Sequence, residues 1–360
     1  MTIVFLALYY WAENSVVKVR PGDYQDKMVA AQIMRHSLET LEKYRLPAVD
    51  RVQTGDVIDP LVYTMLGEKD SPITTDEGRI EDKITVLNPN FAAAVVDLLH
   101  KAHINQGDTI AVLATGSMPG ANLAVYSAAK ALALHPIIIT SVSSSWWGAN
   151  QPDFTWLDME KVLLDQGEFD FRSIAASAGG SDDHGGLRLS ALGRQMITEA
   201  IQRNDVVHIE QGSLSANIRG RIELFERQTA LINYKVVVNI GGGVAALGHR
   251  ENFNLIPSGY NSQLPPQNYP GRGVIHAFAE AGVPVIHIAN VANIAQNYNL
   301  PVAQLPVPRE GVGLVFERKK YNLTSAVIAL ALMFLILALV KWFDRQHYRW
   351  REEKVDKNTI

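Results

Sequence analysis

The stretch AVLATGSMPGANLAVYSAAKAL, residues 111–132, changes its pattern in the middle. Its first half is a run of apolar residues typical of a buried strand, and the run ends at Thr115, Gly116 and Ser117. After Pro119 the apolar residues recur with helical spacing, and proline suits the first turn of a helix because its missing N–H has no partner there. A strand that passes through a glycine directly into a helix indicates a parallel α/β sheet.

The same alternation of strands and helices extends outward in both directions. This order predicts an α/β fold: a mostly parallel sheet with helices on both faces, in a Rossmann-like three-layer arrangement. Two less regular regions are predicted to be an ordered loop (47–85) and a surface loop or lid (251–270). The predicted helices are 24–46, 88–104, 119–132, 156–166, 186–203, 218–230 and 273–282, with a further short helix before Pro301. The predicted strands are 107–114, 135–145, 173–177, 205–211, 235–240 and 283–290.

The C-terminal region contains an uncharged apolar segment, LTSAVIALALMFLILALV, from Leu323 to Val340. Its length approaches the roughly 20 residues that a helix needs to cross the hydrocarbon core of a membrane. We predict a transmembrane helix at 323–341, followed by a basic cytoplasmic tail at 342–360. A buried core helix is the alternative interpretation.

The N-terminal segment MTIVFLALYYWA, residues 1–12, is apolar but too short to span a membrane by itself. We interpret it as part of a transmembrane segment that starts upstream; a signal-anchor remnant and the first strand of the domain are the alternatives. Between the two ends we predict a juxtamembrane helix and ordered loop (13–85) and an α/β domain (86–316). If both ends span, this central part lies outside the cytoplasm, although the cationic run at 318–320 weakens that orientation.

Composition excludes several classes of site. The 360 residues carry a formal net charge of −4, which argues against a nucleic-acid partner because no excess of Lys and Arg is present to neutralise phosphates. The chain has no cysteine, so disulfides, thiolate zinc sites and cysteine nucleophiles are excluded. The sequence has no GxxxxGK[ST] loop and no GxGxxG in its expected place, so we predict no cofactor.

Candidate ligand-binding residues lie where the predicted strands end. The carboxyl ends of parallel strands meet at one edge of a sheet, where backbone N–H groups face a crevice and favour anions. Alternatively, Ser117 is a plain helix cap, the adjacent aspartates form a solvated turn and the tryptophans serve packing. The candidate residues are Thr115, Gly116, Ser117, Asn122, Trp147, Asn150, Asp182, Asp183, Gly241, Gly242 and Gly243.

Ser117 is also a candidate nucleophile, with His184 as its base and Asp183 or Asp182 as the acid that orients the histidine. The G-x-S-x-G elbow is not met, because a proline replaces its second glycine. The two aspartates are also candidates to hold a divalent metal, of unknown identity, because hard cations prefer oxygen ligands. Histidines inside apolar strand patterns are interpreted as core residues: His208 and His287.

Several segments occur together in an order found in one family: SPITT (71–75), TGSMPGAN (115–122), WGANQPDFTWLDME (147–160), GGSDDHG (179–185), NIGGG (239–243) and GVPVIH (282–287). On these segments the chain resembles the membrane-associated poly-gamma-glutamate system proteins of bacteria, over residues 24–316. The family pattern at 115–122 is Ser-Gly-Ser-Phe-Pro-Ala-Leu-Asn. The hydroxyl and the amides of this pattern are therefore matched here, whereas its apolar wall is not.

The resemblance implies a role beside poly-gamma-glutamate synthesis or export at the bacterial cytoplasmic membrane, with the main domain extracytoplasmic. We expect an accessory protein that binds the anionic polymer, or the membrane subunits that synthesise or export it, at its glycine-rich junctions. The alternatives are a serine- or metal-dependent hydrolase or transferase acting on the gamma-amide bond, and a scaffold for synthase subunits. An acidic polymer requires a locally positive crevice, and the candidate cations are Arg188, Arg194, Arg219 and Arg272.

Overall fold

The computed structural model describes residues 2–49 and 60–357, which form two compact units. One unit combines both ends of the chain, residues 2–21 and 317–357, and the other is the α/β domain Gly22–Phe316. Residue 1, residues 50–59 and residues 358–360, which are parts of the predicted segments 1–12, 13–85 and 342–360, lie outside the described residues.

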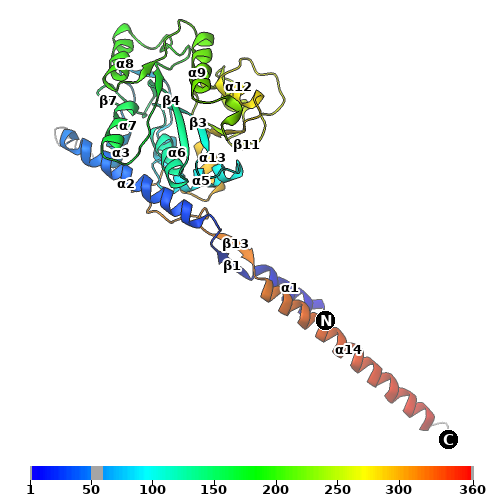
Figure 1. Cartoon of the computed structure of the whole chain (residues 1–360). Coiled ribbons are helices and arrows are strands. Elements are labelled where there is room, and N and C mark those ends of the chain that lie inside the picture. The colour runs from blue at the N-terminus through cyan, green and yellow to red at the C-terminus, as the bar shows by residue number, and fades with distance from the viewer. Residues whose placement is uncertain (1, 50–59, 358–360) are drawn as a thin grey trace. The chain divides into compact units, whose positions relative to one another are not determined.

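The α/β domain is built on a seven-stranded sheet (Figure 1). All pairings in this sheet are parallel except that of its edge strand β11, which runs antiparallel to β12. A mostly parallel α/β sheet is therefore confirmed. In spatial order the strands are β11 (Gly259–Asn261), β12 (Val285–Ile288), β10 (Val237–Ile240), β3 (Thr109–Thr115), β4 (His135–Ser141), β8 (Ala175–Ser177) and β9 (Val207–His208).

Successive residues of the central strand β3 enter different hydrophobic clusters, because side chains of a strand alternate between its two faces. Ile110 and Val112 belong to the cluster that contains α2 (Tyr24–Val49), α5 (Asn90–Lys101), α6 (Pro119–Ala131) and α13 (Val291–Asn297). Ala111 and Leu113 belong to the cluster that contains α9 (Leu214–Gln228) and α12 (Val274–Glu280). Helices therefore cover both faces of the sheet. A third, smaller cluster joins α7 (Trp156–Asp165) and α8 (Ala191–Arg203) to the sheet.

The helix predicted at 24–46 is present as α2 and belongs to the α/β unit. Its buried residues Ala31, Met34, Leu38 and Leu41 form one stripe at helical spacing and contribute to the largest hydrophobic cluster. The helix α2 is thus part of the hydrophobic core of the α/β domain.

The predicted loops contain short elements that periodicity did not indicate. Within 47–85 the described residues form α3 (Pro60–Met65), β2 (Thr74–Asp76) and α4 (Ile80–Thr85). Within 251–270 lie α11 (Asn252–Leu255) and the edge strand β11. Each of these elements has six residues or fewer, which is too short for a helical or alternating pattern to stand out. The remaining short elements are β5 (Ser144–Ser145), β6 (Asn150–Gln151), β7 (Phe154–Thr155), η1 (Leu231–Asn233) and α10 (Val244–Leu247).

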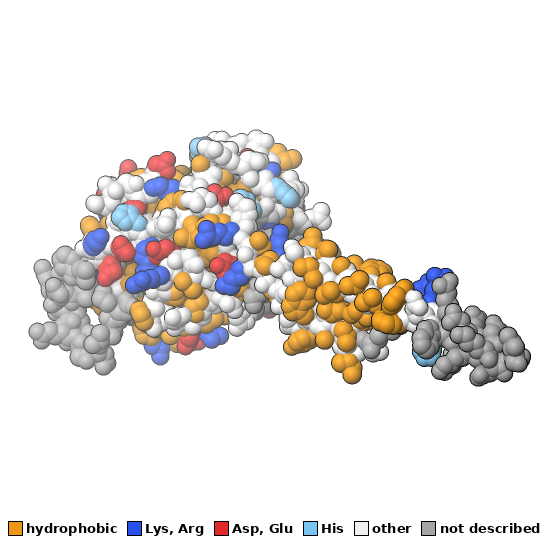
Figure 2. Space-filling view, turned by 90° about the horizontal axis from the view of Figure 1, so that it is seen from below, with side chains coloured by type: hydrophobic (Ala, Val, Ile, Leu, Met, Phe, Trp, Pro, Cys, Tyr) orange, Lys and Arg blue, Asp and Glu red, His pale blue; other side chains and the backbone are white. Residues whose placement is uncertain are grey.

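The unit formed by the two chain ends consists of α1 (Thr2–Asn14), β1 (Val16–Val19), β13 (Arg318–Tyr321) and α14 (Leu323–Lys357). The strands β1 and β13 pair antiparallel, and α1 packs along α14. The 25-residue segment Leu323–His347 of α14 is long and apolar enough to cross a membrane. It is the one such helix among the described residues. Exposed apolar side chains gather on α1 and on the part of α14 from Leu323 to Phe343, as Figure 2 shows for one face.

Candidate functional site

A cavity of about 1030 Å³ opens at the carboxyl ends of the central strands. From β3 the chain continues to β4, β8 and β9 on one side, whereas β10 and β12 lie on the other side, so the strand order reverses between β3 and β10. Ligands of open α/β sheets bind at such a reversal. Residues from the ends of β3, β4, β10 and β12 line the cavity: Thr115, Ser117, Ser141, Gly241 and Ile288.

The turn between β3 and α6 is fixed by close backbone contacts. A side chain at Gly116 would place its Cβ 2.3 Å from the carbonyl oxygen of Val142, so only glycine fits. The buried Asn122 donates from Nδ2 to the carbonyl of Thr115 at 2.8 Å. The Thr115 hydroxyl in turn accepts from the backbone N of Ser117 at 3.2 Å. Asn122 therefore holds the turn from behind, while Thr115 and Ser117 face the cavity.

The triple glycine after β10 lies on the same cavity as the first turn. Gly241, Gly242 and Gly243 all line it, and Gly241 has a left-handed backbone with φ of 73°. A Cβ at Gly241 would be 3.2 Å from the Thr115 side chain, so the two turns are in direct contact. The two glycine-containing junctions that the sequence indicates are thus brought together.

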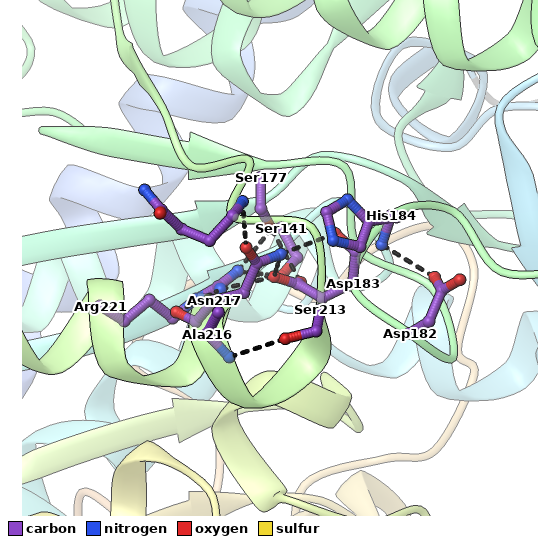
Figure 3. Close-up of polar contacts among 10 residues, drawn as sticks. Ser141, Ser177, Asp182, Asp183, His184, Ser213, Ala216, Asn217 and Arg221 are labelled. Carbon is purple, nitrogen blue, oxygen red and sulfur yellow. Dashed lines mark hydrogen bonds and ion pairs between the residues drawn. The ribbon is translucent and has the colours of Figure 1, made fainter.

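Asp183 lies inside the protein instead of in the cavity (Figure 3). Its carboxylate forms an ion pair with Arg221 of α9, with Nη1 2.5 Å from Oδ2, and both side chains are almost fully buried. The same carboxylate accepts from the Ser177 hydroxyl at 2.8 Å and from Asn217 Nδ2 at 2.9 Å. All these partners are polar and well oriented, so the pair anchors the 179–186 loop to α9 and β8.

The neighbouring residues of this loop do not complete a serine triad. Asp182 is exposed, and its Oδ1 accepts from the backbone N of His184 at 2.8 Å and of Gly186 at 2.7 Å, as Figure 3 shows in part. Among the described residues no hydrogen bond joins Ser117 to His184, and neither His184 nor Asp182 lines the cavity. No group of three or more possible metal ligands of the His, Cys, Asp and Glu types occurs in the described part of the chain.

The tryptophan-rich segment forms the framework beside the cavity. The buried Asn150 donates from Nδ2 to the carbonyl of Glu68 at 2.8 Å and to the Thr74 hydroxyl at 3.0 Å. Trp147 adopts a positive φ of 60° and donates its backbone N–H to Glu68 at 3.0 Å. Neither side chain lines the cavity, so both predicted ligand-binding residues are placed in its supporting structure.

The helix predicted from residue 156 begins as expected, and of the two histidines interpreted as core residues His287 is buried, whereas His208 is half-buried with Nδ1 3.7 Å from a carboxylate oxygen of Glu210. The carboxylate of Asp158 accepts from the backbone N of Thr155 at 2.7 Å, as expected for a helix N-terminus at this position. His287 is fully buried in β12, where its Nδ1 lies 2.9 Å from Asn239 Nδ2. Burial lowers the pKa of His287 to about 4, so it is a neutral core residue at physiological pH.

The sequence analysis does not indicate Lys83, a buried lysine that lines the cavity. Its Nζ donates to the carbonyl oxygen of Ser117 and, at 2.8 Å, to the Ser145 hydroxyl, and it lies 3.4 Å from the sulfur of Met118. The side chain is 3% exposed, and no carboxylate forms an ion pair with it in the described residues. Burial lowers the pKa of Lys83 to about 8, against the opposing charge of the nearby Asp82.

A row of hydroxyls accompanies this lysine. Ser141, Ser143 and Ser145 are spaced by two residues, so an extended backbone directs all three to the same side, and all three line the cavity. The alternation SxSxS in the printed sequence is the signal that could have indicated them. No comparable signal marks Lys83, because nothing in the pattern around it shows that its side chain is buried.

Charged residues on the rim are mixed, with a small positive excess. Three arginines and Lys83 line the cavity together with three acids, Asp76, Glu77 and Asp82. Arg250 is paired with Asp76, and Arg79 lies 3.7 Å from Glu81. Among the described residues Arg188 has no ion pair or hydrogen-bond partner for its side chain. Of the four candidate cations from the sequence, it is the one that lines the cavity.

Comparison with known proteins provides no relative: no family model, curated protein or solved structure matches this chain.

Proposed function

We propose that this chain is a membrane-anchored accessory protein of the bacterial cell envelope whose α/β domain binds a carboxylate-bearing polymer in the cavity between β3 and β10. The observation that carries the proposal is the set of binding groups at this reversal of strand order. Two glycine-containing turns, a row of hydroxyls and two cations line one cavity of about 1030 Å³, and in the described part of the chain neither cation, Lys83 or Arg188, has a carboxylate partner.

The charges of the cavity favour an anionic ligand. A buried lysine without a carboxylate partner keeps its positive field inside the protein, where it is screened less than at the surface. Arg188 on the rim offers a planar set of donors suited to a carboxylate. A ligand carboxylate would supply the ion-pair partner that Arg188 lacks among the described residues.

The proposed ligand is poly-gamma-glutamate, the polymer implied by the resemblance of the 71–75, 115–122, 147–160, 179–185, 239–243 and 282–287 segments. A chain with one carboxylate per residue can occupy the cavity with one unit and contact rim cations with its neighbours, so that several weak contacts add up. The net charge of −4 opposes long-range attraction, and binding therefore depends on the local excess of cations.

Two structural features support the proposed membrane anchor and the proposed arrangement of layers. The apolar segment Leu323–His347 of α14 supports anchoring in a membrane, with the α/β domain on the extracytoplasmic side as part of the proposal. The reversal of strand order between β3 and β10 supports a Rossmann-like arrangement of the three layers.

The proposal is tested by calorimetric titration of the full chain, in detergent micelles, with poly-gamma-glutamate oligomers. We expect binding that weakens with salt, and at least about a tenfold loss of affinity for the same oligomer with its carboxylates amidated. Arg188→Gln should weaken binding about three- to tenfold, since it removes one charge-assisted contact. The matched control is Arg219→Gln, which removes an exposed arginine of α9 outside the cavity. Equal affinity for the charged and the amidated oligomer would refute the proposal.

A further inference from the structure

The cavity contains a serine and a lysine in direct contact, separate from the predicted Ser117 and His184. Lys83 Nζ lies 2.8 Å from the hydroxyl oxygen of Ser145, and this is the one hydrogen bond that the described residues provide to that hydroxyl. Both residues line the cavity, and Ser145 is 8% exposed there. We propose that Ser145 is a nucleophile and Lys83 its general base, in an acyl-transfer site that acts on an amide or ester of a carboxylate-bearing chain.

Three elements of the fold assemble this pair. Lys83 is in the last turn of α4, Ser145 is in β5, and the turn between β3 and α6 supplies the other two contacts of the amine, the Ser117 carbonyl and the Met118 sulfur. The Ser117 hydroxyl accepts from the backbone N of Ser145 at 3.0 Å and so fixes the position of that residue. Ser117, predicted as the nucleophile, is thus assigned a positioning role.

Lys83 is a cation while it holds its third proton, and its contacts also suit the neutral amine that remains when that proton is lost. Such an amine has two N–H groups, which can donate to the Ser117 carbonyl and toward the Met118 sulfur. Its lone pair is then directed at the remaining neighbour, the Ser145 hydroxyl, and accepts the proton of that group. A serine activated by a lysine is a known alternative to the serine–histidine pair.

The reaction divides into two balanced steps. In the first, the Ser145 oxygen bonds to the carbonyl carbon while its proton passes to Lys83; the bond from carbon to the leaving nitrogen or oxygen then breaks, and Lys83 returns the proton to that atom. In the second, a water molecule attacks the acyl-serine ester with Lys83 again taking and returning the proton, which releases a carboxylic acid and restores Ser145.

Burial makes the neutral amine accessible near physiological pH. Desolvation lowers the pKa of Lys83 to about 8, and the charge of Asp82 on the same helix opposes that change. The other charged groups that line the cavity are Asp76, Glu77 and Arg79 of the preceding segment and Arg188 and Arg250, and His249 is a further titratable side chain on its lining. The adjacent α13 and the first two turns of α6 carry no ionisable side chain.

Gly78 leaves the serine open to the cavity. A Cβ at this position would lie 2.9 Å from the Ser145 hydroxyl oxygen and 2.7 Å from the carbonyl oxygen of Trp146. Gly78 itself lines the cavity, so a side chain there would stand between the ligand space and the serine. The absence of a side chain at Gly78 is what a nucleophile at this depth requires.

The nucleophile is tested with a fluorophosphonate, which reacts with activated serines and carries no carboxylate, so this test does not depend on the proposed polymer. The full chain in detergent micelles is treated between pH 6 and pH 10, and the modified residue is mapped by mass spectrometry. We expect the adduct on Ser145, at a rate that rises with pH with a midpoint near 8.

Lys83→Met should slow labelling at least about 100-fold, as removal of a general base does, and Lys83→Arg should not restore it. Ser215→Ala, which changes an exposed serine of α9 outside the cavity, serves as the control.

The substrate class rests on the proposed function and is tested separately, by comparing hydrolysis of the 4-nitrophenyl ester of a glutaric half-acid with that of a neutral 4-nitrophenyl ester of equal length. Faster turnover of the charged ester, lost in Ser145→Ala, supports both proposals. Labelling of Ser145 without preference for the charged ester keeps the nucleophile and overturns its substrate class. Absence of an adduct on Ser145 in the folded chain, or equal labelling of Lys83→Met, overturns the nucleophile whether or not the chain binds the polymer.

Discussion

Two buried charged groups close to the cavity, the Asp183–Arg221 pair and Lys83, differ in how their charge is neutralised. On the α9 side Asp183 is paired with Arg221 and receives further hydrogen bonds from Ser177 and Asn217. On the α4 side Lys83 has two oxygens and a sulfur as neighbours but no carboxylate in the described residues.

The difference separates a structural charge from a functional one. A fully paired ion pair has little left to offer a ligand, and its loss exposes an unpaired charge to the interior. A buried lysine without a counter-ion costs stability and is retained at sites where its proton is used. The adjacent carboxylates that dominate the sequence pattern are therefore the scaffold, and the inconspicuous lysine carries the chemistry that we propose.

The largest effect is expected from breaking the ion pair between Asp183 and Arg221. Asp183→Asn removes the partner of Arg221, whose side chain is only 2% exposed, and should destabilise the protein by about 3–5 kcal/mol. Thermal and denaturant unfolding of the full chain in detergent, monitored by tryptophan fluorescence, measures this loss. A change below about 1 kcal/mol would mean that the pair contributes no more than a surface ion pair does.

A smaller change in stability, of opposite sign, is expected from replacing Lys83. With a folded-state pKa of about 8 against 10.5 for an ordinary lysine, keeping Lys83 charged at pH 7 costs on the order of 3 kcal/mol. Lys83→Met removes this cost together with hydrogen bonds worth about 1 kcal/mol, so the variant should be about 2 kcal/mol more stable at pH 7.

The sign of the pH dependence follows from proton binding. Between pH 8 and pH 10.5 the unfolded chain holds the lysine proton and the folded chain does not, so the stability of the wild type rises with pH in this window. The advantage of Lys83→Met should therefore shrink as pH increases from 8 to 10.5. Lys161→Met, at an exposed position of α7, is the control and should show no such trend.

The smallest effect is expected at the other member of the adjacent carboxylates. Asp182 is exposed, and its Oδ1 accepts from two backbone N–H groups of its own loop. Asp182→Asn retains an acceptor oxygen at the same place, and the loss should stay below about 1 kcal/mol. Unfolding measured beside Asp183→Asn tests the contrast; equal losses in the two variants would contradict the assignment of Asp183 as the anchor.

The sequence predicts the fold where patterns are long. The apolar runs of β3, β4, β10 and β12 and the periodic helices between them were placed correctly, and the rule that parallel strands end at one edge brought Ser117 and the triple glycine to one cavity. Short elements such as α4 and β11 have too few residues to show a period.

Some parts of the site depend on contacts between residues that are far apart in the sequence, and these could not be predicted from local patterns. The partner of Asp183 is Arg221, 38 positions further on, and the Ser145 that meets Lys83 is 62 positions away. Neither pairing leaves a trace in local spacing. Asn122 was expected to bind a ligand because it stands beside the glycine turn, yet the same proximity lets its amide hold Thr115 instead.

The antiparallel ribbon of β1 and β13 has a consequence for how the chain assembles. Its register pairs Val16 with Tyr321, residues about 300 positions apart, so closing it from an unfolded chain would cost a large loop entropy. The folded α/β domain reduces that cost, because its own first and last segments already meet where the rings of Tyr24 and Phe316 lie 6.3 Å apart. We therefore expect β1 and β13 to pair only after the domain has folded. Pairing of the two chain ends is then the last step of folding.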